Sequence, residues 1–253
     1  MSMNATAPSG PMIGDAFGQL LLSASAHDGL PDIAYETTER DDGLLTVRDA
    51  CYYFTPVLPD DPHGRLLADV SGRVLDIGCG AGRHLLHLKH RGVAALGIDT
   101  SPGAVQVCGH RGADAICGDI RRPPALGTFD TLLLLGGNLG LLGTPGDARA
   151  LLIGLAQLAN PSARLIAEGF DATATSDPAH ITYQTGNLES GRHRGQVTVR
   201  VRYRGLATAW LDLWFPPAED LPAVVSGTGW TLTTVEPAGE GSGYHVVLSR
   251  STP

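Results

Sequence analysis

The sequence predicts an α/β protein with an open, mostly parallel β-sheet, and two observations support this fold class. Segments of strand character alternate with segments of helical character between residues 73 and 169. Within that region, Phe129–Leu135 is predominantly apolar, as expected of a parallel strand that is buried on both faces. A chain of 253 residues can form one domain with a sizeable core and an appended cap or insertion.

The elements of this region follow from their apolar patterns and their end signals. Helix Ser101–His110 has Ser101 as its N-cap and Pro102 at its first position, and helix Pro145–Ala159 has Thr144 as its N-cap. Helix Gly82–His90 and the strands Arg73–Ile77, Ala94–Ile98, Ala113–Cys117, Phe129–Leu135 and Arg164–Gly169 complete the predicted sheet.

The segment before the sheet is predicted to be mainly helical. Apolar residues at helical spacing predict a helix at Ile13–Ala26, and a second short helix is predicted at Thr46–Tyr53. Residues 1–70 are therefore predicted to form a tail, loose over Met1–Pro11, and a helical cap that acts as a lid. A purely structural cap is the alternative. Residues 71–253 are predicted to be the main domain.

After Phe170 the pattern changes to a polar loop and a hairpin. Asp171–Arg192 is predicted to be a loop. Strands Gln196–Arg204 and Thr208–Phe215 alternate apolar and polar residues, which predicts a hairpin inserted at about residues 194–215. The arginine stripe of the first strand is predicted to be a solvated face, with a clamp for an anionic substrate as the alternative.

The register of the hairpin follows from its side chains. A three-residue loop, Gly205–Ala207, places Arg200 opposite Asp212, whereas a two-residue loop places Arg200 opposite Leu211 among apolar residues. We therefore predict the three-residue loop, or a bulge that gives the same pairing. The chain is predicted to close with a helix at Ala218–Ser226 and an antiparallel edge made of strands Thr231–Glu236 and Tyr244–Leu248.

Composition and charge limit the classes of partner. The formal net charge is −8 with scattered basic residues, which disfavours nucleic acid as a partner. The most apolar run, Leu132–Leu142, is too short to cross a bilayer, so no membrane contact is predicted. The four cysteines have no metal-ligand spacing and no signal peptide precedes them, which predicts reduced thiols in a cytoplasmic protein.

The glycine-rich stretch Val74–Gly82 is the strongest functional signal. A strand enters it and a helix leaves it. Glycines at positions 78, 80 and 82 let a ligand approach the backbone beside the unpaired N–H groups of the helix start. This arrangement predicts a site for a nucleotide-like ligand.

Polar residues and bare backbone end the next three strands at the same edge of the sheet. Asp99 is placed to accept hydrogen bonds from ribose hydroxyls. Asp119 suits the amino group of adenine, with Ile120 against the ring. Gly136–Asn138 leaves exposed backbone where the reacting end of the ligand would lie.

These segments resemble the class I S-adenosylmethionine-dependent methyltransferases of the small-molecule type, including those of actinobacterial biosynthetic clusters. Val74–Gly82 resembles their first motif, Gly97–Pro102 their acidic second motif and Gly118–Ile120 their third. The resemblance covers about residues 73–169. It implies a Rossmann-like sheet, S-adenosylmethionine as the cofactor, and methyl transfer to an oxygen, nitrogen or carbon of a small acceptor in secondary metabolism.

The resemblance also implies a set of cofactor residues. The first-motif glycines would face the methionine part of the cofactor, and Asp76 would orient the turn. The implied set is Asp76, Gly78, Cys79, Gly80, Asp99, Thr100, Asp119, Ile120, Gly136 and Asn138. Because Gly136–Asn138 differs from the Asn/Asp-Pro-Pro-aromatic motif of amino-directed nucleic-acid methyltransferases, DNA and RNA bases are not the predicted acceptors.

Two other functions stay open at this point. A nicotinamide-dependent oxidoreductase is disfavoured because the third glycine comes one residue early for the GxGxxG pattern. A non-catalytic protein that binds the same cofactor is the second alternative.

General bases are predicted outside the cofactor motifs. Methyl transfer to oxygen or nitrogen often removes a proton, and His180, Tyr183 and Tyr35 are the candidates for this role, with ordinary packing as the alternative. No metal site is predicted. The histidines at positions 84, 87 and 90 drift round a helix and have no acidic partner in the pattern, so a solvated face is expected.

Overall fold

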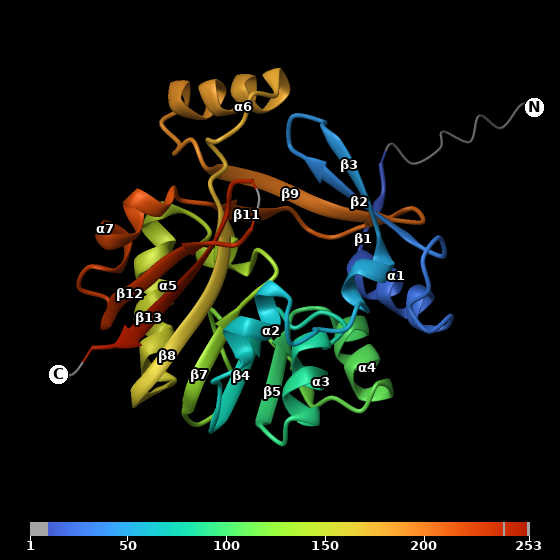
Figure 1. Ribbon diagram of the computed structural model, residues 1–253. Helices are drawn as coiled ribbons and strands as arrows, with labels where there is room; N and C mark the ends of the chain where they lie inside the picture. The colour runs from blue at the N-terminus through green and yellow to red at the C-terminus, as the bar shows by residue number, and fades with distance from the viewer. Residues whose placement is uncertain (1–9, 240, 252–253) are drawn as a thin grey trace, which may run out of the picture.

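The computed structural model describes residues 10–239 and 241–251 and contains two β-sheets (Figure 1). The larger sheet, called the main sheet, has seven strands in the order β12-β13-β8-β7-β4-β5-β6. Strands β4 to β8 run parallel, and β13 is antiparallel to both of its neighbours. The predicted α/β class, with a mostly parallel sheet and an antiparallel edge, is confirmed. Most of the predicted loose tail, Met1–Pro11, lies outside the described residues.

The main sheet closely follows the predicted elements. Its strands are β4 (Arg73–Ile77), β5 (Ala94–Asp99), β6 (Ala115–Cys117), β7 (Phe129–Leu134), β8 (Ala159–Phe170), β12 (Trp230–Pro237) and β13 (Gly243–Arg250). Its helices are α2 (Pro62–Leu67), α3 (Arg83–His90), α4 (Pro102–His110), α5 (Pro145–Gln157) and α7 (Leu221–Val225), the last preceded by a 3₁₀ turn at Ala218–Asp220. Ser101 and Thr144 cap α4 and α5 as predicted.

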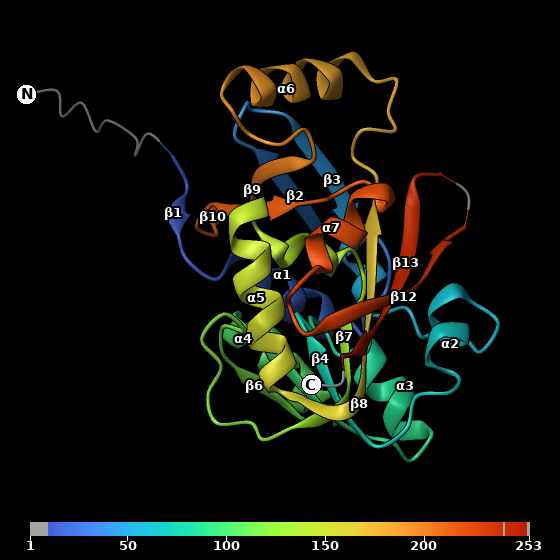
Figure 2. The same ribbon diagram turned by 90° about the vertical axis from the view of Figure 1, so that its left-hand side faces the viewer.

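Helices cover both faces of the main sheet (Figure 2). On one face, Leu67 of α2 and Leu88 of α3 pack on Leu133 of β7. On the other, Leu155 of α5 and Val225 of α7 join the largest core cluster. The parallel strands are therefore buried on both sides, which is why their sequences are so apolar. No helix of the described residues has the length and apolar character that a bilayer crossing requires.

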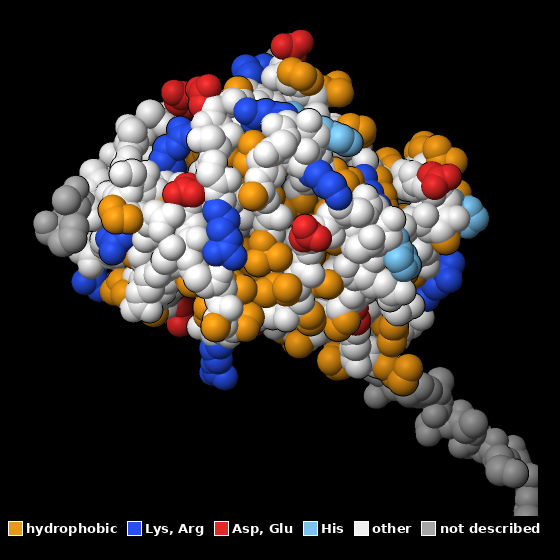
Figure 3. Space-filling model, turned by 90° about the horizontal axis from the view of Figure 1, so that it is seen from below, with side chains coloured by type: hydrophobic (Ala, Val, Ile, Leu, Met, Phe, Trp, Pro, Cys, Tyr) orange, Lys and Arg blue, Asp and Glu red, His pale blue; other side chains and the backbone are white. Residues whose placement is uncertain are grey.

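The second sheet lies across the carboxyl end of the main sheet (Figure 1). Its strands are β1 (Met12–Ile13), β2 (Tyr35–Arg40), β3 (Leu45–Asp49), β9 (Gln196–Tyr203), β10 (Leu206–Ala207) and β11 (Leu211–Trp214). Helix α1 (Ala16–Ser25) packs between this sheet and α4, and α6 (Pro178–Glu189) lies beyond it. At the opposite end of the molecule, charges of both signs are scattered among apolar side chains (Figure 3).

Two predicted elements outside the main sheet are wrong. The segment Thr46–Tyr53 is a strand up to Asp49, where it pairs with β2, and only Ala50–Tyr53 is a 3₁₀ turn. The predicted loop Asp171–Arg192 contains α6, which Asp177 caps by accepting a hydrogen bond from Ala179. In the first case pairing with a neighbouring strand overrides local propensity. In the second case the sequence does contain a signal for a helix start, because the N-cap residue Asp177 is followed by Pro178 at the first helical position.

The predicted three-residue loop of the hairpin is also wrong. The turn is the two-residue pair Arg204-Gly205, both with positive φ, and Leu206 is opposite Tyr203. Farther along, Leu211 is opposite Val199 and Asp212 is opposite Thr198. An extra residue between β10 and β11 therefore makes a bulge, which restores the predicted apolar and polar faces in a different register.

Candidate functional site

Three glycines shape the turn between β4 and α3. Gly78, Gly80 and Gly82 have φ values of 71°, 53° and 77°, a region that other residues rarely adopt. The Nδ2 amide of Asn138 donates hydrogen bonds to the carbonyls of Ile77 and Gly78 at 2.9 and 3.0 Å. A Cβ on Gly78 would lie 2.6 Å from this amide. Asn138 therefore fixes the turn rather than standing free beside it.

Asp99 at the end of β5 is tied to the same turn. Its Oδ2 accepts a hydrogen bond from the Gly80 N–H, and its Oδ1 accepts one from the Ser101 N–H, both at 2.9 Å. Burial raises the pKa of Asp99, and these two N–H groups oppose that effect. Because a carboxylate has about four acceptor positions, each oxygen keeps one for a ligand.

Asp76 and Cys79 are buried beneath the turn. The Oδ2 atom of Asp76 points toward α3 and lies 3.5 Å from Nδ1 of His84. The Cys79 thiol lies 4.0 Å from the thiol of Cys108, and this contact together with burial raises the pKa of Cys79 well above its ordinary value. The cysteine therefore packs as a small neutral side chain beneath the turn.

The other predicted cofactor residues are open to solvent. Thr100, Asp119 and Gly136 are exposed, and Ile120 is partly buried against the main core. A Cβ on Gly136 would meet no atom within 4 Å, so the backbone there is accessible. All ten predicted residues thus gather around the carboxyl ends of β4 to β7, whereas their contacts with a cofactor stay predictions.

Tyr53 and Glu36, for which the sequence predicted no role, form a hydrogen-bonded pair beside the glycine turn. Phe17 and Tyr53 each approach the Cβ position of Gly80 to 3.9 Å, and their rings pack edge to face. The Tyr53 hydroxyl donates a 2.5 Å hydrogen bond to Glu36, a carboxylate that is only 7% exposed. Burial and the charge of Glu36 hold the pKa of Tyr53 well above its ordinary value. The Tyr53 ring therefore connects the buried Glu36 carboxylate of the second sheet to the glycine turn.

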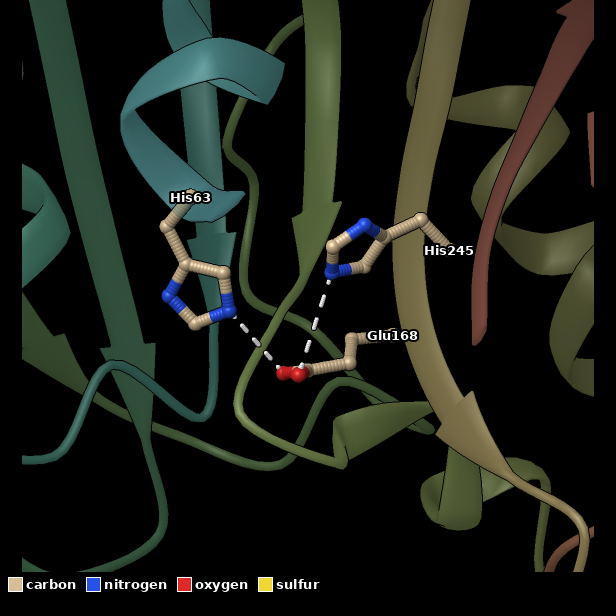
Figure 4. A group of neighbouring side chains, drawn as sticks. All are labelled: His63, Glu168 and His245. Atoms are coloured by element: carbon tan, nitrogen blue, oxygen red, sulfur yellow. Dashed lines mark hydrogen bonds and ion pairs between the residues drawn. The ribbon is translucent and has the colours of Figure 1, made fainter. Parts of the chain in front are cut away.

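A second unpredicted cluster surrounds Glu168 of β8 (Figure 4). Its Oε2 accepts hydrogen bonds from the Gly136 and Gly137 N–H groups at 2.6 and 3.2 Å. The same oxygen lies 3.0 Å from Nε2 of His63, and Oε1 lies 3.9 Å from Nε2 of His245. Burial opposes ionisation, but the His63 contact and the backbone donors bring the pKa of Glu168 to about 2. The rule that found Asp99, a carboxylate near the carboxyl end of a parallel strand, also applies to Glu168.

The predicted solvated histidine face is wrong for His84. This side chain is buried, and its Nε2 lies 3.1 Å from Nδ1 of His63. Burial lowers the pKa of His84. His87 is partly buried and His90 is exposed, as a drifting helical spacing requires.

His180 and Tyr183 lie together on α6 around Arg40 of β2. Nδ1 of His180 is 2.9 Å from the Arg40 guanidinium, which also stacks 4.1 Å from the centre of the Tyr183 ring. The Tyr183 hydroxyl donates to Asp41 at 2.7 Å and accepts from the Thr198 N–H at 3.2 Å. These contacts join α6 to the second sheet.

Tyr35 lies apart from these two residues. Its hydroxyl donates to Asp32, and its side chain is 45% exposed. It lines a shallow hollow of about 560 Å³ together with Arg202 and Tyr203. That hollow contains none of the predicted cofactor residues, so we place the candidate site at the glycine turn. The roles of His180, Tyr183 and Tyr35 as bases stay predictions.

Comparisons with known proteins agree with this geometry. Residues 74–162 match the family model described as a methyltransferase domain. No curated protein matches the chain. A methyltransferase of Bacteroides fragilis, solved with S-adenosyl-L-homocysteine, has a similar structure at a TM-score of 0.79 and 22% identity, over 94% of this chain and 95% of that one.

Two sugar-modifying enzymes share the fold at lower similarity. An amino pentose methyltransferase of Micromonospora echinaspora gives a TM-score of 0.53 at 22% identity, over 74% of this chain and 87% of that one. A sugar N-methyltransferase of a Streptoalloteichus species gives 0.52 at 18% identity, over 72% and 81%. The predicted Rossmann-like fold class is thereby confirmed, and the part of the chain that matches the methyltransferase domain model lies within the region where the sequence resembles that family.

Proposed function

We propose that this chain, a class I methyltransferase by its fold and by its domain at residues 74–162, binds S-adenosylmethionine at the glycine turn and methylates a small molecule. The carrying observation is the turn itself, with Asp99 hydrogen-bonded to the Gly80 N–H across it. The Bacteroides fragilis neighbour, which was solved with S-adenosyl-L-homocysteine, supports the same cofactor here.

The residues at the carboxyl ends of the strands fit this cofactor. Asp99 keeps acceptor positions for the ribose hydroxyls. Asp119 is exposed beside the partly buried Ile120, as an adenine site requires, and Gly136 leaves its backbone open. The cofactor supplies an activated methyl group when bound. The protein's part is to hold the acceptor in line with that group and to exclude water.

The proposed acceptor site lies between the glycine turn and the second sheet. Phe17 and Tyr53 form its wall, and the buried Glu36 offers an acceptor for a hydroxyl or ammonium group. Two structural neighbours are described as sugar methyltransferases, which supports a small polar acceptor from secondary metabolism, methylated at oxygen, nitrogen or carbon. In this proposal residues 1–70, which include Phe17 and Tyr53, act as the predicted lid.

Calorimetric titration with S-adenosylhomocysteine tests the cofactor site. We expect binding at one site per chain, and an absence of binding would contradict the proposal. Asp99→Ala removes a charged hydrogen-bond acceptor worth about 1.5–3 kcal/mol, which corresponds to binding weaker by about 10- to 150-fold. Asp114→Ala is the matched control, because Asp114 is an exposed carboxylate outside the site. Turnover with amino sugars and other small acceptors then distinguishes a methyltransferase from a protein that only binds the cofactor.

A further inference from the structure

Three side chains from separate elements converge at one edge of the main sheet (Figure 4). Glu168 of β8 and His245 of β13 are cross-strand neighbours, so their side chains lie on the same face. His63 of α2 covers them from above that face. One potential ligand atom from each residue lies within 4.8 Å of the other two.

The cluster is largely shielded from water. The side chains of His63 and His245 are 7% and 8% exposed, and that of Glu168 is 23% exposed. Nε2 of His245 is buried and has no hydrogen-bond partner among the described residues. Native structures rarely leave a buried ring nitrogen unpaired. This nitrogen faces a carboxylate oxygen at 3.9 Å, beyond hydrogen-bond range.

We propose that His63, Glu168 and His245 bind a divalent transition-metal ion, with zinc as the best fit. Two imidazoles and one carboxylate are the donor set of many zinc sites that keep a fourth position open. Nitrogen donors disfavour magnesium and calcium, which prefer oxygen ligands. In a tetrahedral site with bonds of about 2.1 Å the ligand atoms lie about 3.4 Å apart, so the present separations close by about 1.4 Å at most.

A supporting shell for His63 is already in place. Its Nδ1 lies 3.1 Å from Nε2 of His84, whose Nδ1 lies 3.5 Å from Oδ2 of Asp76. When Nε2 of His63 coordinates, its Nδ1 carries the proton and donates it to His84, which donates in turn to Asp76. Such outer partners are typical of metal-bound histidines. The last hydrogen bond of this series goes to Oδ2 of Asp76, a buried atom that otherwise has no hydrogen-bond partner among the described residues.

Arg83 opposes metal binding. Its guanidinium donates to Nδ1 of His63 at 2.9 Å, which leaves the ring proton on Nε2, where it is donated to Glu168. An ion can bind Nε2 of His63 only if the hydrogen bonds from Arg83 and to Glu168 break and the ring proton moves to Nδ1. Removal of the guanidinium is therefore expected to tighten binding, an effect that a purely structural hydrogen-bond network does not predict.

The position of the cluster would let a bound ion act on the methyl acceptor, an inference that rests on the proposed function. Glu168 accepts hydrogen bonds from Gly136 and Gly137, at the end of β7 where the reacting end of the cofactor is predicted to lie. An acceptor oxygen at the fourth position would lose its proton more readily and would be held near that end.

Direct metal titration tests the site. The full chain is treated with a chelator and titrated with Zn²⁺ by calorimetry and with Co²⁺ by visible absorption, without cofactor. We expect one ion per chain and no competition from Mg²⁺. His245→Ala and Glu168→Gln should weaken binding at least 100-fold, and His90→Ala, at an exposed histidine, should not change it. Arg83→Met should tighten binding at least threefold.

Two outcomes overturn the proposal: a wild-type protein that binds no stoichiometric zinc, or His245→Ala and Glu168→Gln variants that bind zinc as the wild type does. S-adenosylhomocysteine is titrated separately into the same proteins. Cofactor binding without zinc binding contradicts the metal site alone, and zinc binding without cofactor binding contradicts the proposed function alone.

Discussion

The two sheets of this molecule are specified by different kinds of interaction. At the carboxyl edge of the main sheet, backbone defines the site: three left-handed glycines and the N–H groups that hold Asp99 and Glu168. In the second sheet, side chains define the structure. Arg200 pairs with Glu39, and Tyr53 donates to Glu36. We therefore expect an added Cβ to be most damaging in the glycine turn of the main sheet, and the loss of a side-chain contact to be most damaging in the second sheet.

The largest expected effect is that of Gly78→Ala in the glycine turn. Alanine disfavours the φ of 71° by about 1–2 kcal/mol, and its Cβ would lie 2.6 Å from the Asn138 amide. The turn must shift, and we expect S-adenosylhomocysteine to bind at least 100-fold more weakly in a calorimetric titration.

Gly154→Ala in α5 is the matched control for that variant. Gly154 has no positive φ, and a Cβ there meets no atom within 4 Å. We expect unchanged ligand affinity and a gain of about 0.5–1 kcal/mol in stability, because alanine is the better helix former. Wild-type affinity in Gly78→Ala would show that the turn is not defined by its backbone.

A smaller effect is expected from Tyr53→Phe at the second sheet. The ring that approaches Gly80 is kept, but Glu36 loses a donor while it stays buried. The free energy of unfolding should fall by about 1–3 kcal/mol in urea titrations, because a buried acceptor is left short of a partner. S-adenosylhomocysteine affinity should stay within about threefold of the wild type.

Tyr52→Phe supplies the comparison for Tyr53→Phe. Tyr52 precedes Tyr53 in the same turn, and its hydroxyl makes no hydrogen bond to the described residues. We expect little change in its unfolding free energy. Equal losses in the two variants would mean that the Tyr53–Glu36 contact does not stabilise the second sheet.

The contrast between the main sheet and the second sheet also explains which strands the sequence could predict. Strands such as Arg73–Ile77 feed directly into the next helix, so local periodicity and caps such as Ser101 identify them. Strand β3 is held by β2, which in turn pairs with β9 about 160 residues away in the chain, and no local pattern contains that pairing. The predicted register of the hairpin was wrong because an extra residue lies before Leu211. This bulge keeps the apolar and polar residues on their predicted faces, so the alternation in the sequence does not reveal it.

The residues of the candidate site show the same contrast between local sequence signals and long-range packing. The positions of Asp99 and Asp119 at the carboxyl ends of β5 and β6 were predictable because each lies at a recognisable strand end within a spaced motif. Glu36 and His63 were not, because they come from segments whose position depends on the packing of α2 and the second sheet. Glu168 is the exception, since it lies near the end of a strand that the sequence did predict.

The smallest expected effect is that of the arginines on β9, which were predicted to be a solvated stripe. Arg200 and Arg202 instead bind Glu39 at 2.7 and 3.3 Å, with side chains 16% and 39% exposed. We expect Arg200→Ala to cost about 1 kcal/mol of unfolding free energy, and Arg202→Ala less than about 0.5 kcal/mol, because exposed ion pairs are screened by water and salt.

The pH dependence of Arg200→Ala separates charge from packing. The hydrogen bond from Arg200 lowers the pKa of Glu39 below its ordinary value of 4.5. This contribution is therefore fully present above about pH 4.5 and is lost as the pH falls through the lowered pKa. Arg200 also stacks 4.4 Å from the centre of the Trp210 ring, a contact that does not titrate. Urea titrations at pH 7 and about pH 3 should therefore show a difference between wild type and variant that shrinks at acid pH without vanishing. A difference that is independent of pH would assign the whole effect to stacking and remove the ion pair from the account of the second sheet.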